Sequence, residues 1–183
     1  MTILKPGRLI QAVGGPGVNV AFDVFDPDPD LITISGIAHT LANLCRFGGH
    51  CTPFYSVAQH CYHVSYLAPG SERLAGLLHD ASEAYLVDIP APLKTSGLFD
   101  EYLKIEETLQ AVINQKFGVP IKLSDKIRQA DLIMLATERR DFMSPIVEEI
   151  WINLPQPQKT GIYPWEPLQA ERAFHNRFRE LTK

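Results

Sequence analysis

Three segments of the chain carry side chains whose types and spacing suit metal chemistry. The stretch SVAQH ends at His60, HDASE begins with His79 and Asp80, and RQADLIML contains Asp131. Two imidazoles and two carboxylates suit a divalent ion of octahedral preference, such as Mn²⁺, Co²⁺, Fe²⁺ or Ni²⁺, better than a thiolate-rich structural zinc site, although Zn²⁺ is also compatible. Four protein ligands would leave two positions for water and a substrate oxygen, as a catalytic centre requires.

The second of these segments lies in LAGLLHDASEAYL, residues 74–86, which reads as an apolar helix with polar residues in its middle. Asp80 and Glu83 are three positions apart and His79 and Glu83 are four apart, so on one helix they would share a face. The apolar neighbours indicate that this face is partly buried. Buried carboxylates without partners are costly, so we expect a cation opposite them.

Two plainer readings of this helix stay open. The imidazole and the acids could form an ion-pair network, with the cation supplied by Arg46, Lys94 or Arg128. Alternatively, the two acids could lie on a solvated stripe. The presence of His60 in one apolar stretch and of Asp131 in another favours the metal site over both readings.

Length and composition predict a single globular domain. The chain has 183 residues, of which 45% are hydrophobic and 21% charged. Its formal net charge of -4 argues against broad binding to a long nucleic acid. No window approaches a membrane span and the N-terminal stretch lacks the features of a signal peptide, so we expect a cytoplasmic protein. Three cysteines without CxxC spacing (Cys45, Cys51 and Cys61) fit reduced thiols.

The expected fold class is mainly α, with about six helices after a small N-terminal β element. Within residues 1–34, VNVAFDVF and LITIS predict short strands, and GGPG and DPDPD predict turns; DPDPD lacks the ligand pattern of a calcium loop. Caps and stops predict helices over residues 35–47, 56–68, 71–86, 99–118, 124–143 and 168–181. Residues 35–145 would form the catalytic core, and residues 146–183 a proline-rich linker and a final helix.

The ordered set of His, His-Asp and Asp resembles the HD-domain phosphohydrolase superfamily. The segments HDASEAYLVDIPAPLK, YLKIEETLQAVINQKFG and RQADLIML are similar to the bacterial 5'-deoxynucleotidases of that superfamily, and CRFGGHCTPFYSVAQH resembles their phage-type relatives. The likeness spans roughly residues 34–143. It implies an HD-domain helical bundle that hydrolyses nucleoside 5'-monophosphates, with a preference for deoxyribonucleotides, by attack of a metal-bound water.

The resemblance also implies roles for single residues. It makes metal ligands of His60, His79, Asp80 and Asp131. Glu83 matches the acid that orients or deprotonates the attacking water, and Asp88 matches a second acid at the mouth of the site. Arg46 matches an arginine that binds the substrate phosphate, and Lys94 matches a lysine that is a candidate phosphate contact. The interval of nineteen residues from His60 to His79 is shorter than in the deoxynucleotidase branch, where the extra segment could shape the sugar pocket.

The remaining histidines have weaker cases. His63 lies one helical turn after His60 and could be the ligand in its place, although the SVAQH match favours His60. His50 follows a glycine pair and could donate to a phosphate or serve the loop structurally. His39 and His175 have no partner at ligand spacing, so we expect structural roles.

Two features near the C-terminal end have structural interpretations. The stretch ERRD, residues 138–141, is typical of a salt-bridged helix face. Trp151 and Trp165 are expected to pack the C-terminal segment, although an aromatic ring near the mouth could stack on a base.

Other functions stay open on the sequence. Within enzymes, the alternatives are a (deoxy)nucleoside triphosphate triphosphohydrolase and a phosphodiester or alarmone hydrolase. The small number of nearby cations favours a monophosphate. A non-catalytic, metal-containing nucleotide-binding domain would tolerate loss of the water-activating acid, and the presence of Glu83 favours an enzyme. The expected partner is a small nucleotide substrate, with no membrane and no long nucleic acid. Relatives in the resembled family are often homodimers, so a homodimer or a higher homo-oligomer is compatible with the sequence.

Overall fold

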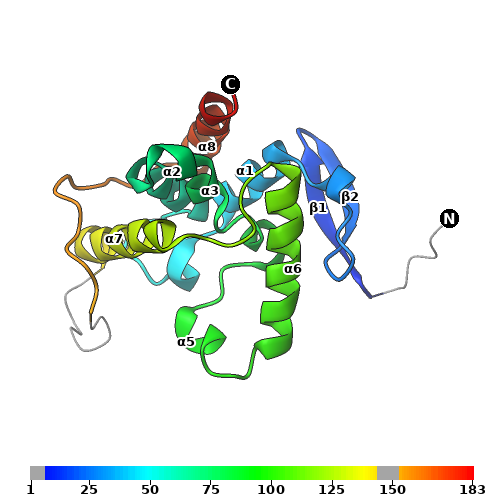
Figure 1. Cartoon of the computed structure of the whole chain (residues 1–183), viewed down its shortest axis with the longest axis horizontal. Coiled ribbons are helices and arrows are strands. Elements are labelled where there is room, and N and C mark those ends of the chain that lie inside the picture. The colour runs from blue at the N-terminus through cyan, green and yellow to red at the C-terminus, as the bar shows by residue number, and fades with distance from the viewer. Residues whose placement is uncertain (1–6, 144–152) are drawn as a thin grey trace.

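Helices form most of the chain in the computed structural model, which describes residues 7–143 and 153–183 (Figure 1). A two-stranded antiparallel sheet precedes them, formed by β1 (Leu9–Gly15) and β2 (Val18–Asp23). The helices are α1 (Ile34–Asn43), α2 (Val57–Leu67), α3 (Arg73–Leu78), α4 (Glu83–Leu86), α5 (Ala91–Lys94), α6 (Asp100–Lys116), α7 (Asp125–Phe142) and α8 (Pro167–Leu181). The predicted fold class, mainly α with a small N-terminal β element, is confirmed at this level. No helix among the described residues has the length and apolar character that crossing a bilayer requires.

The β element differs in part from the prediction. Strand β2 coincides with the predicted strand in VNVAFDVF, and GGPG forms the turn before it. The predicted strand in LITIS is wrong, because Leu31 closes a 3-10 helix and Ile34 begins α1. The side chain of Thr33 accepts the Gly36 N–H and so caps α1 one residue before that helix starts. Strand β1 was not predicted, because the adjacent apolar residues at its start break the alternation of a half-buried strand.

Four of the predicted helices are confirmed, and they correspond to α2, α6, α7 and α8. Two of them begin at the predicted serine caps. The Ser56 side chain accepts the Gln59 N–H at the start of α2, and the Ser124 side chain accepts the Ile127 N–H at the start of α7. The short helix α5 was not predicted.

Two predicted helices are shorter than expected, and both breaks lie at candidate site residues. Helix α1 ends at Asn43, and the chain then forms a 3-10 turn over Arg46–Gly49 in which Phe47 has a φ of 58°. This turn is anchored by the Arg46 N–H, which donates to the Tyr55 carbonyl at 2.8 Å. The predicted helix over residues 71–86 is broken between Leu78 and Glu83, so that α3 and α4 are separate.

Helices α2 and α3 form a pair joined by a short link that contains a 3-10 turn, Gly70–Glu72. Gly76 permits their close approach, since a Cβ there would lie 3.1 Å from the Ala68 Cβ. Helix α7 packs against α2, and α8 packs against α1 and α2 (Figure 1). The three elements that carry the candidate ligands are therefore neighbours.

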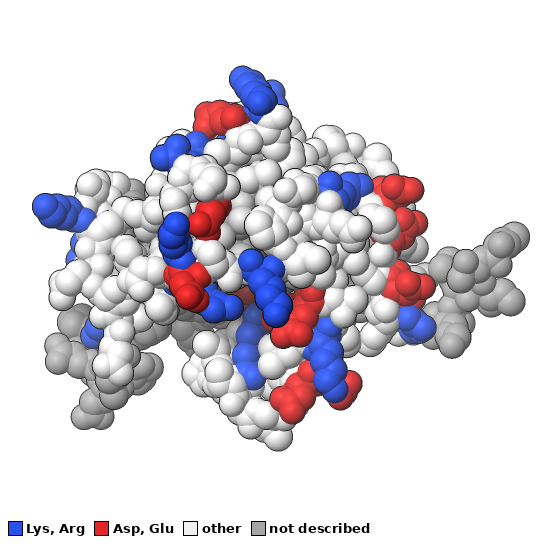
Figure 2. All heavy atoms as spheres, in the orientation of Figure 1, with Lys and Arg blue, Asp and Glu red and all other residues white. Residues whose placement is uncertain are grey.

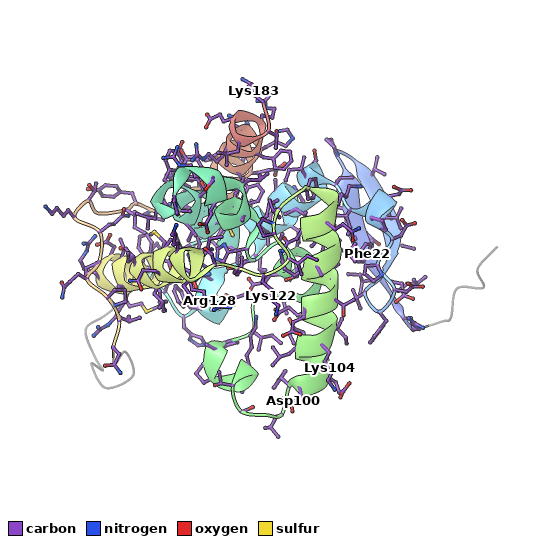
Figure 3. The ribbon with its side chains drawn as sticks, in the orientation of Figure 1. Phe22, Asp100, Lys104, Lys122, Arg128 and Lys183 are labelled. Carbon is purple, nitrogen blue, oxygen red and sulfur yellow. The ribbon has the colours of Figure 1, made fainter. Side chains whose placement is uncertain are left out.

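The main core lies between the hairpin and these helices. Its fully buried side chains include Phe22, Ile37, Leu41, Leu77, Leu78 and Phe174. Phe22, labelled in Figure 3, extends from β2 and stacks on Tyr85 of α4 with ring centroids 4.4 Å apart. The hairpin thus closes the core on the side of α4, the helix that begins with Glu83.

The hairpin is also fixed to the start of α1. The Thr33 hydroxyl donates to the Gly14 carbonyl at 2.8 Å, and a Cβ on Gly36 would lie 2.0 Å from the Val13 carbonyl oxygen. Only glycine fits at position 36 while the hairpin remains in contact with α1.

Replacing Gly36 with alanine should therefore lower the free energy of unfolding by about 1–3 kcal/mol, because the hairpin must move away from α1. Urea denaturation followed by circular dichroism would measure the change. Gly15→Ala is the matched control, since nothing lies within 4 Å of a Cβ there. Equal effects of the two substitutions would contradict the close contact.

Candidate metal centre

Two buried imidazoles face each other at the centre of the site. His60 lies in the first turns of α2 and His79 directly follows α3. Their Nε2 atoms are 3.2 Å apart, and the side chains are 0% and 4% exposed. The pairing of α2 with α3 brings together two residues that are nineteen positions apart in the sequence.

The opposite nitrogen of each ring is held by a hydrogen-bond acceptor. His60 Nδ1 lies 2.6 Å from Glu138 Oε1, and His79 Nδ1 lies 2.9 Å from the Gly76 carbonyl oxygen. A carbonyl or an ionised carboxylate can only accept, so both Nδ1 atoms carry hydrogen. At most one further hydrogen fits between the two facing Nε2 atoms, which leaves a lone pair there to bind a cation. Metal-ligating histidines commonly have such an acceptor on the second nitrogen.

Two carboxylates complete this cluster. Asp131 on α7 places Oδ1 3.1 Å from His60 Nε2 and 4.0 Å from His79 Nε2. Asp80 places Oδ2 3.2 Å from His79 Nε2 and 3.7 Å from His60 Nε2. Donor atoms of His60, His79 and Asp131 all lie within 4.8 Å of one another, as do those of Cys61, His79 and Asp80. These groups could hold a metal ion.

The electrostatics of the cluster favour positive charge between the carboxylates. Burial would raise the pKa of Asp80, but His79, His60 and Arg46 lower that pKa far below its usual range. Burial would likewise raise the pKa of Asp131, which the hydrogen bond and charge of His60 lower instead. Burial would lower the pKa of His79, and the charge of Asp80 raises it well above normal. A divalent cation at this position would also compensate the negative charges of the two carboxylates.

The break after α3 changes how these residues come together. A continuous helix was expected to present His79, Asp80 and Glu83 on one face, and that expectation is wrong. The chain leaves the helix at Leu78, and the Glu83 N–H donates to the Asp80 carbonyl at 3.1 Å to form a turn. The turn lets Asp80 reach the imidazoles and Arg46, while Glu83 begins α4.

Arg46 lies beside the cluster, with its side chain 10% exposed. Its Nη1 lies 3.5 Å from Asp80 Oδ2, and its Nε lies 3.3 Å from Glu138 Oε2. Burial would lower the pKa of this guanidinium, but Glu138 and then Asp80 raise it well above its usual value. Arg46 is therefore a fixed positive charge at the edge of the cluster.

Glu138 is a residue of the site that was expected elsewhere. The stretch of residues 138–141 was predicted to be a salt-bridged helix face, and this holds for Arg140 and Asp141, whose side chains pair at 2.7 Å. It is wrong for Glu138, which is 0% exposed and contacts His60. One signal was available in the sequence: Glu138 follows Asp131 by seven positions, which places both on the same side of a helix two turns apart.

Glu83 lies buried with one oxygen unpartnered. Its Oε2 has no hydrogen-bond partner among the described residues, and its Oε1 lies 3.6 Å from Lys94 Nζ. Burial raises the pKa of Glu83 well above its usual value, and the charges of Asp80 and Asp88 add to this effect. An oriented carboxyl group with a raised pKa is suited to exchanging a proton near neutral pH.

The other predicted contacts occupy different positions around the site. Lys94 pairs with Glu106 at 2.7 Å as well as with Glu83, so in this structure its ammonium contacts acids. Asp88 accepts the Phe47 N–H at 3.3 Å and so links the two loops beside the cluster. His50 is exposed, and no described contact joins its ring to the cluster.

The loops that Asp88 links are both strained. Phe47 has a φ of 58°, and Val87 has a φ of 69° with a ψ of 162°, a region that is almost confined to glycine. Strain of this kind persists only where the surroundings impose it, and it is frequent at functional sites.

The remaining histidines lie away from the cluster. His63 packs against Trp165 and Tyr62, with ring centroids 5.3 and 5.5 Å away. His39 pairs with Glu171 at 3.0 Å, and the His175 ring contacts the Ser35 hydroxyl. Trp165 thus packs in the C-terminal segment, as expected, whereas Trp151 lies outside the described residues.

Charged side chains on the outer surface are of both signs. Figure 2 shows acidic and basic residues interspersed over the visible face, and several of them form pairs within one helix, such as Glu101 with Lys104 at 2.6 Å. This face carries no extended basic track of the kind that binds a nucleic-acid backbone.

Comparison with known proteins gives one extensive match. The chain is 44% identical over 160 residues to the uncharacterized protein YfdR of Escherichia coli (strain K12), covering 84% of this chain and 86% of YfdR. The chain belongs to the YfdR family. An uncharacterized protein of Rhodobacter capsulatus is 38% identical over 117 residues, or 59% of each chain, and the chain matches no model of a known protein family. The similarity to YfdR includes most of both proteins.

Removing either facing imidazole of this YfdR-family protein should strongly weaken its binding of a divalent metal ion. His60→Ala and His79→Ala should each weaken the affinity for Mn²⁺ or Co²⁺ by more than the roughly 10–100-fold expected for loss of an outer hydrogen-bond partner. Competition with a chromophoric chelator would measure the dissociation constants. His63→Gln is the matched control on the same helix, and an equal loss in that variant would contradict the assignment of His60.

Stability should depend on the protonation of His63. Burial, followed by repulsion from His60, lowers the pKa of His63 to about 4. The unfolded chain, with a histidine pKa of about 6.5, takes up the proton first as the pH falls, so the stability contributed by neutral His63 is present above about pH 6.5 and is lost as the pH falls through about 4. The full loss is at most about 3 kcal/mol.

Urea denaturation of chelator-treated protein between pH 7 and 4 would measure this dependence. The free energy of unfolding of His63→Gln should fall less steeply than that of the wild type over this range. Parallel curves for the two proteins would exclude the contribution.

Proposed function

We propose that this protein is a metal-dependent phosphohydrolase of the HD-domain superfamily that removes phosphate from nucleoside 5'-monophosphates, with a preference for deoxyribonucleotides. One observation carries the proposal: two buried Nε2 atoms face each other 3.2 Å apart, with Asp131 and Asp80 beside them. The nucleotide specificity rests on the resemblance of the segments around these residues to 5'-deoxynucleotidases.

The donor atoms of His60, His79 and Asp131 have a spacing compatible with one octahedral ion, whereas Asp80 groups with His79 and Cys61 and lies 3.7 Å from His60 Nε2. Ligands about 2.1 Å from an octahedral ion lie about 3.0 Å apart when adjacent and about 4.2 Å apart when opposite, whereas tetrahedral ligands lie about 3.4 Å apart throughout. The separations from His60 Nε2 to His79 Nε2 and Asp131 Oδ1 are 3.2 and 3.1 Å, and that from His79 Nε2 to Asp131 Oδ1 is 4.0 Å. These unequal separations, together with imidazole and carboxylate donors, support Mn²⁺, Co²⁺, Fe²⁺ or Ni²⁺ as the ion.

The chain would supply the groups that such a reaction needs around the ion. A bound divalent ion supplies a Lewis acid and lowers the pKa of water at the site. Glu83 would hold the attacking water and accept its proton. Its Oε2 is buried without a hydrogen-bond partner among the described residues, and the charge of Asp80, three positions earlier, adds to the effect of burial in raising its pKa.

Arg46 and Asp88 would act on the substrate. Arg46 carries a permanent charge 3.5 Å from Asp80, where it would stabilise negative charge on the phosphoryl oxygens. Asp88 lies on the adjoining loop and would protonate the departing sugar oxygen directly or through water. The pairing of Lys94 with Glu83 supports a role in setting the charge of Glu83 more than a direct phosphate contact.

The balance of charge around the cluster supports a monophosphate substrate. Among the described residues, the acids of the site have Arg46 and Lys94 as their cationic partners, and each of these contacts two carboxylates. Because both cations are already paired with acids of the site, they leave less positive charge for a bound phosphate than the longer, more highly charged phosphate chain of a triphosphate needs. The alternative of a triphosphohydrolase is therefore less well supported.

A screen of metals against nucleotides would test the proposal. Protein stripped with a chelator would be reloaded with Mn²⁺, Co²⁺, Fe²⁺, Ni²⁺, Zn²⁺ or Mg²⁺ and mixed with deoxynucleoside and ribonucleoside mono- and triphosphates. Release of inorganic phosphate from the 5'-monophosphates is expected. Release of triphosphate would identify the alternative enzyme, and metal binding without hydrolysis of any nucleotide would identify a non-catalytic domain.

Two substitutions should separate metal binding from catalysis. Glu83→Ala should keep the metal and lower kcat by about 10²–10⁴-fold, the usual contribution of a general base. Asp80→Ala should lose both metal affinity and turnover. Glu101→Ala removes an exposed glutamate of α6 and should leave both unchanged. Full activity in Asp80→Ala would overturn the assignment of the site.

A further inference from the structure

Glu138 contacts three parts of the candidate site at once. Its Oε1 accepts a hydrogen bond from the Tyr55 hydroxyl at 2.8 Å and lies 2.6 Å from His60 Nδ1. Its Oε2 lies 3.3 Å from Arg46 Nε. These partners come from α2, from the segment before it, and from the 3-10 turn over Arg46–Gly49, while Glu138 itself lies on α7.

All of these contacts lie away from solvent. Glu138 and the His60 side chain are 0% exposed, and the Arg46 side chain is 10% exposed. In such surroundings water cannot replace a lost partner, and an ion pair that loses one member leaves the other charge unpaired. The orientations of His60 and Arg46 therefore depend on the same carboxylate.

The two contacts act on different functions of the site. A carboxylate acceptor on Nδ1 keeps the hydrogen on that nitrogen, leaves Nε2 bare for the ion, and makes the ring a stronger ligand. The contact with Arg46 is an ion pair without a well-aligned hydrogen bond, so its strength depends on the charge of Glu138. A neutral side chain of the same shape could keep part of the first contact and would lose the second.

We propose that Glu138 is a positioning residue that orients both the metal ligand His60 and the phosphate-binding Arg46, so that metal affinity and substrate affinity depend on one buried carboxylate. The effect of Glu138 on metal affinity is inferred from the donor cluster alone, whereas its effect on substrate affinity rests on the proposed function. In this role Glu138 would act through His60 and Arg46 without itself binding the ion or the substrate.

Glu138→Gln is the variant that tests this proposal, and Tyr55→Phe is its matched control. The glutamine keeps the shape of the side chain and removes its charge. Tyr55→Phe removes one hydrogen bond from the same carboxylate and leaves the contacts to His60 and Arg46. Competition with a chromophoric chelator would give the Co²⁺ dissociation constant, and hydrolysis of a deoxynucleoside 5'-monophosphate at saturating metal would give kcat and KM.

Glu138→Gln should weaken Co²⁺ binding by about 10–100-fold, as loss of an outer partner of a metal-ligating histidine does. At saturating metal its KM should rise at least as much as its kcat falls, because Arg46 loses its fixed orientation. Tyr55→Phe should change the dissociation constant and KM by less than about threefold. A purely structural role would lower the folded fraction and leave the dissociation constant and KM of the folded protein unchanged, and that result would overturn the proposal.

A second pair of variants covers failure of Glu138→Gln to fold. Arg46→Gln combined with Glu138→Gln removes both members of the buried ion pair, so no unpaired charge remains there. Relative to Arg46→Gln alone, the double variant should lose a further 10–100-fold in Co²⁺ affinity, because His60 loses its carboxylate partner. Equal affinities would refute the role of Glu138. If the wild type binds Co²⁺ without hydrolysing nucleotides, the proposed function fails while these affinity comparisons still decide the role of Glu138.

Discussion

The contact between the His60 and His79 imidazoles is the constraint on which the centre of this fold depends. Two ring nitrogens are held 3.2 Å apart in a buried position, with acceptors on both of their opposite nitrogens, so a shared hydrogen or a cation must lie between their lone pairs. The nearby carboxylates of Asp80 and Asp131 add negative charge beside them. Burying so many lone pairs in an apolar core is unfavourable, so the polar cluster needs a compensating positive charge.

The helical framework is arranged so that short segments meet at this contact. Helix α2 carries His60, the end of α3 carries His79, and α7 carries both Asp131 and Glu138 on one side. The connections between helices supply two further groups, namely Asp80 in the turn after α3 and Arg46 in the turn after α1, where Phe47 and Gly48 have non-helical backbone. Rigid helices thus position the donors, and strained loops position the charged groups around them.

The helices and the main donors could be predicted because they depend on local patterns. Serine caps and glycine stops identified α2, α6 and α7, and the types and spacing of His60, His79 and Asp131 identified a cluster that the structure brings together. The break between Leu78 and Glu83 could not be read from spacing, because the sequence there is compatible with a continuous helix. The turn is held by Gln110 of α6, which accepts the Ser82 N–H and donates to the Leu78 carbonyl.

Glu138 shows a second limit of local reasoning. In the sequence it belongs to a charged run that is typical of a solvated face, and Arg140 and Asp141 in that run do pair near the surface. Its burial results from the packing of α7 against α2, and the seven-residue spacing from Asp131 indicates this better than the charged run around it. Strand β1 was not predicted for a related reason. Its apolar and polar residues alternate only weakly, and its pairing with β2 stabilises it as a strand.

The pairing of α2 with α3 has a consequence for comparing homologues. The link between the two helices, at Ala68–Glu72, lies at the end of the pair opposite to the imidazoles, and Leu67 follows His60 by seven residues, or about 10 Å along a helix. Extra residues in a homologue that are inserted at this link would extend the helix pair away from the candidate metal centre. Differences in length there should therefore leave the donor cluster unchanged, whereas changes on the Arg46 and Asp88 loops would alter its surroundings.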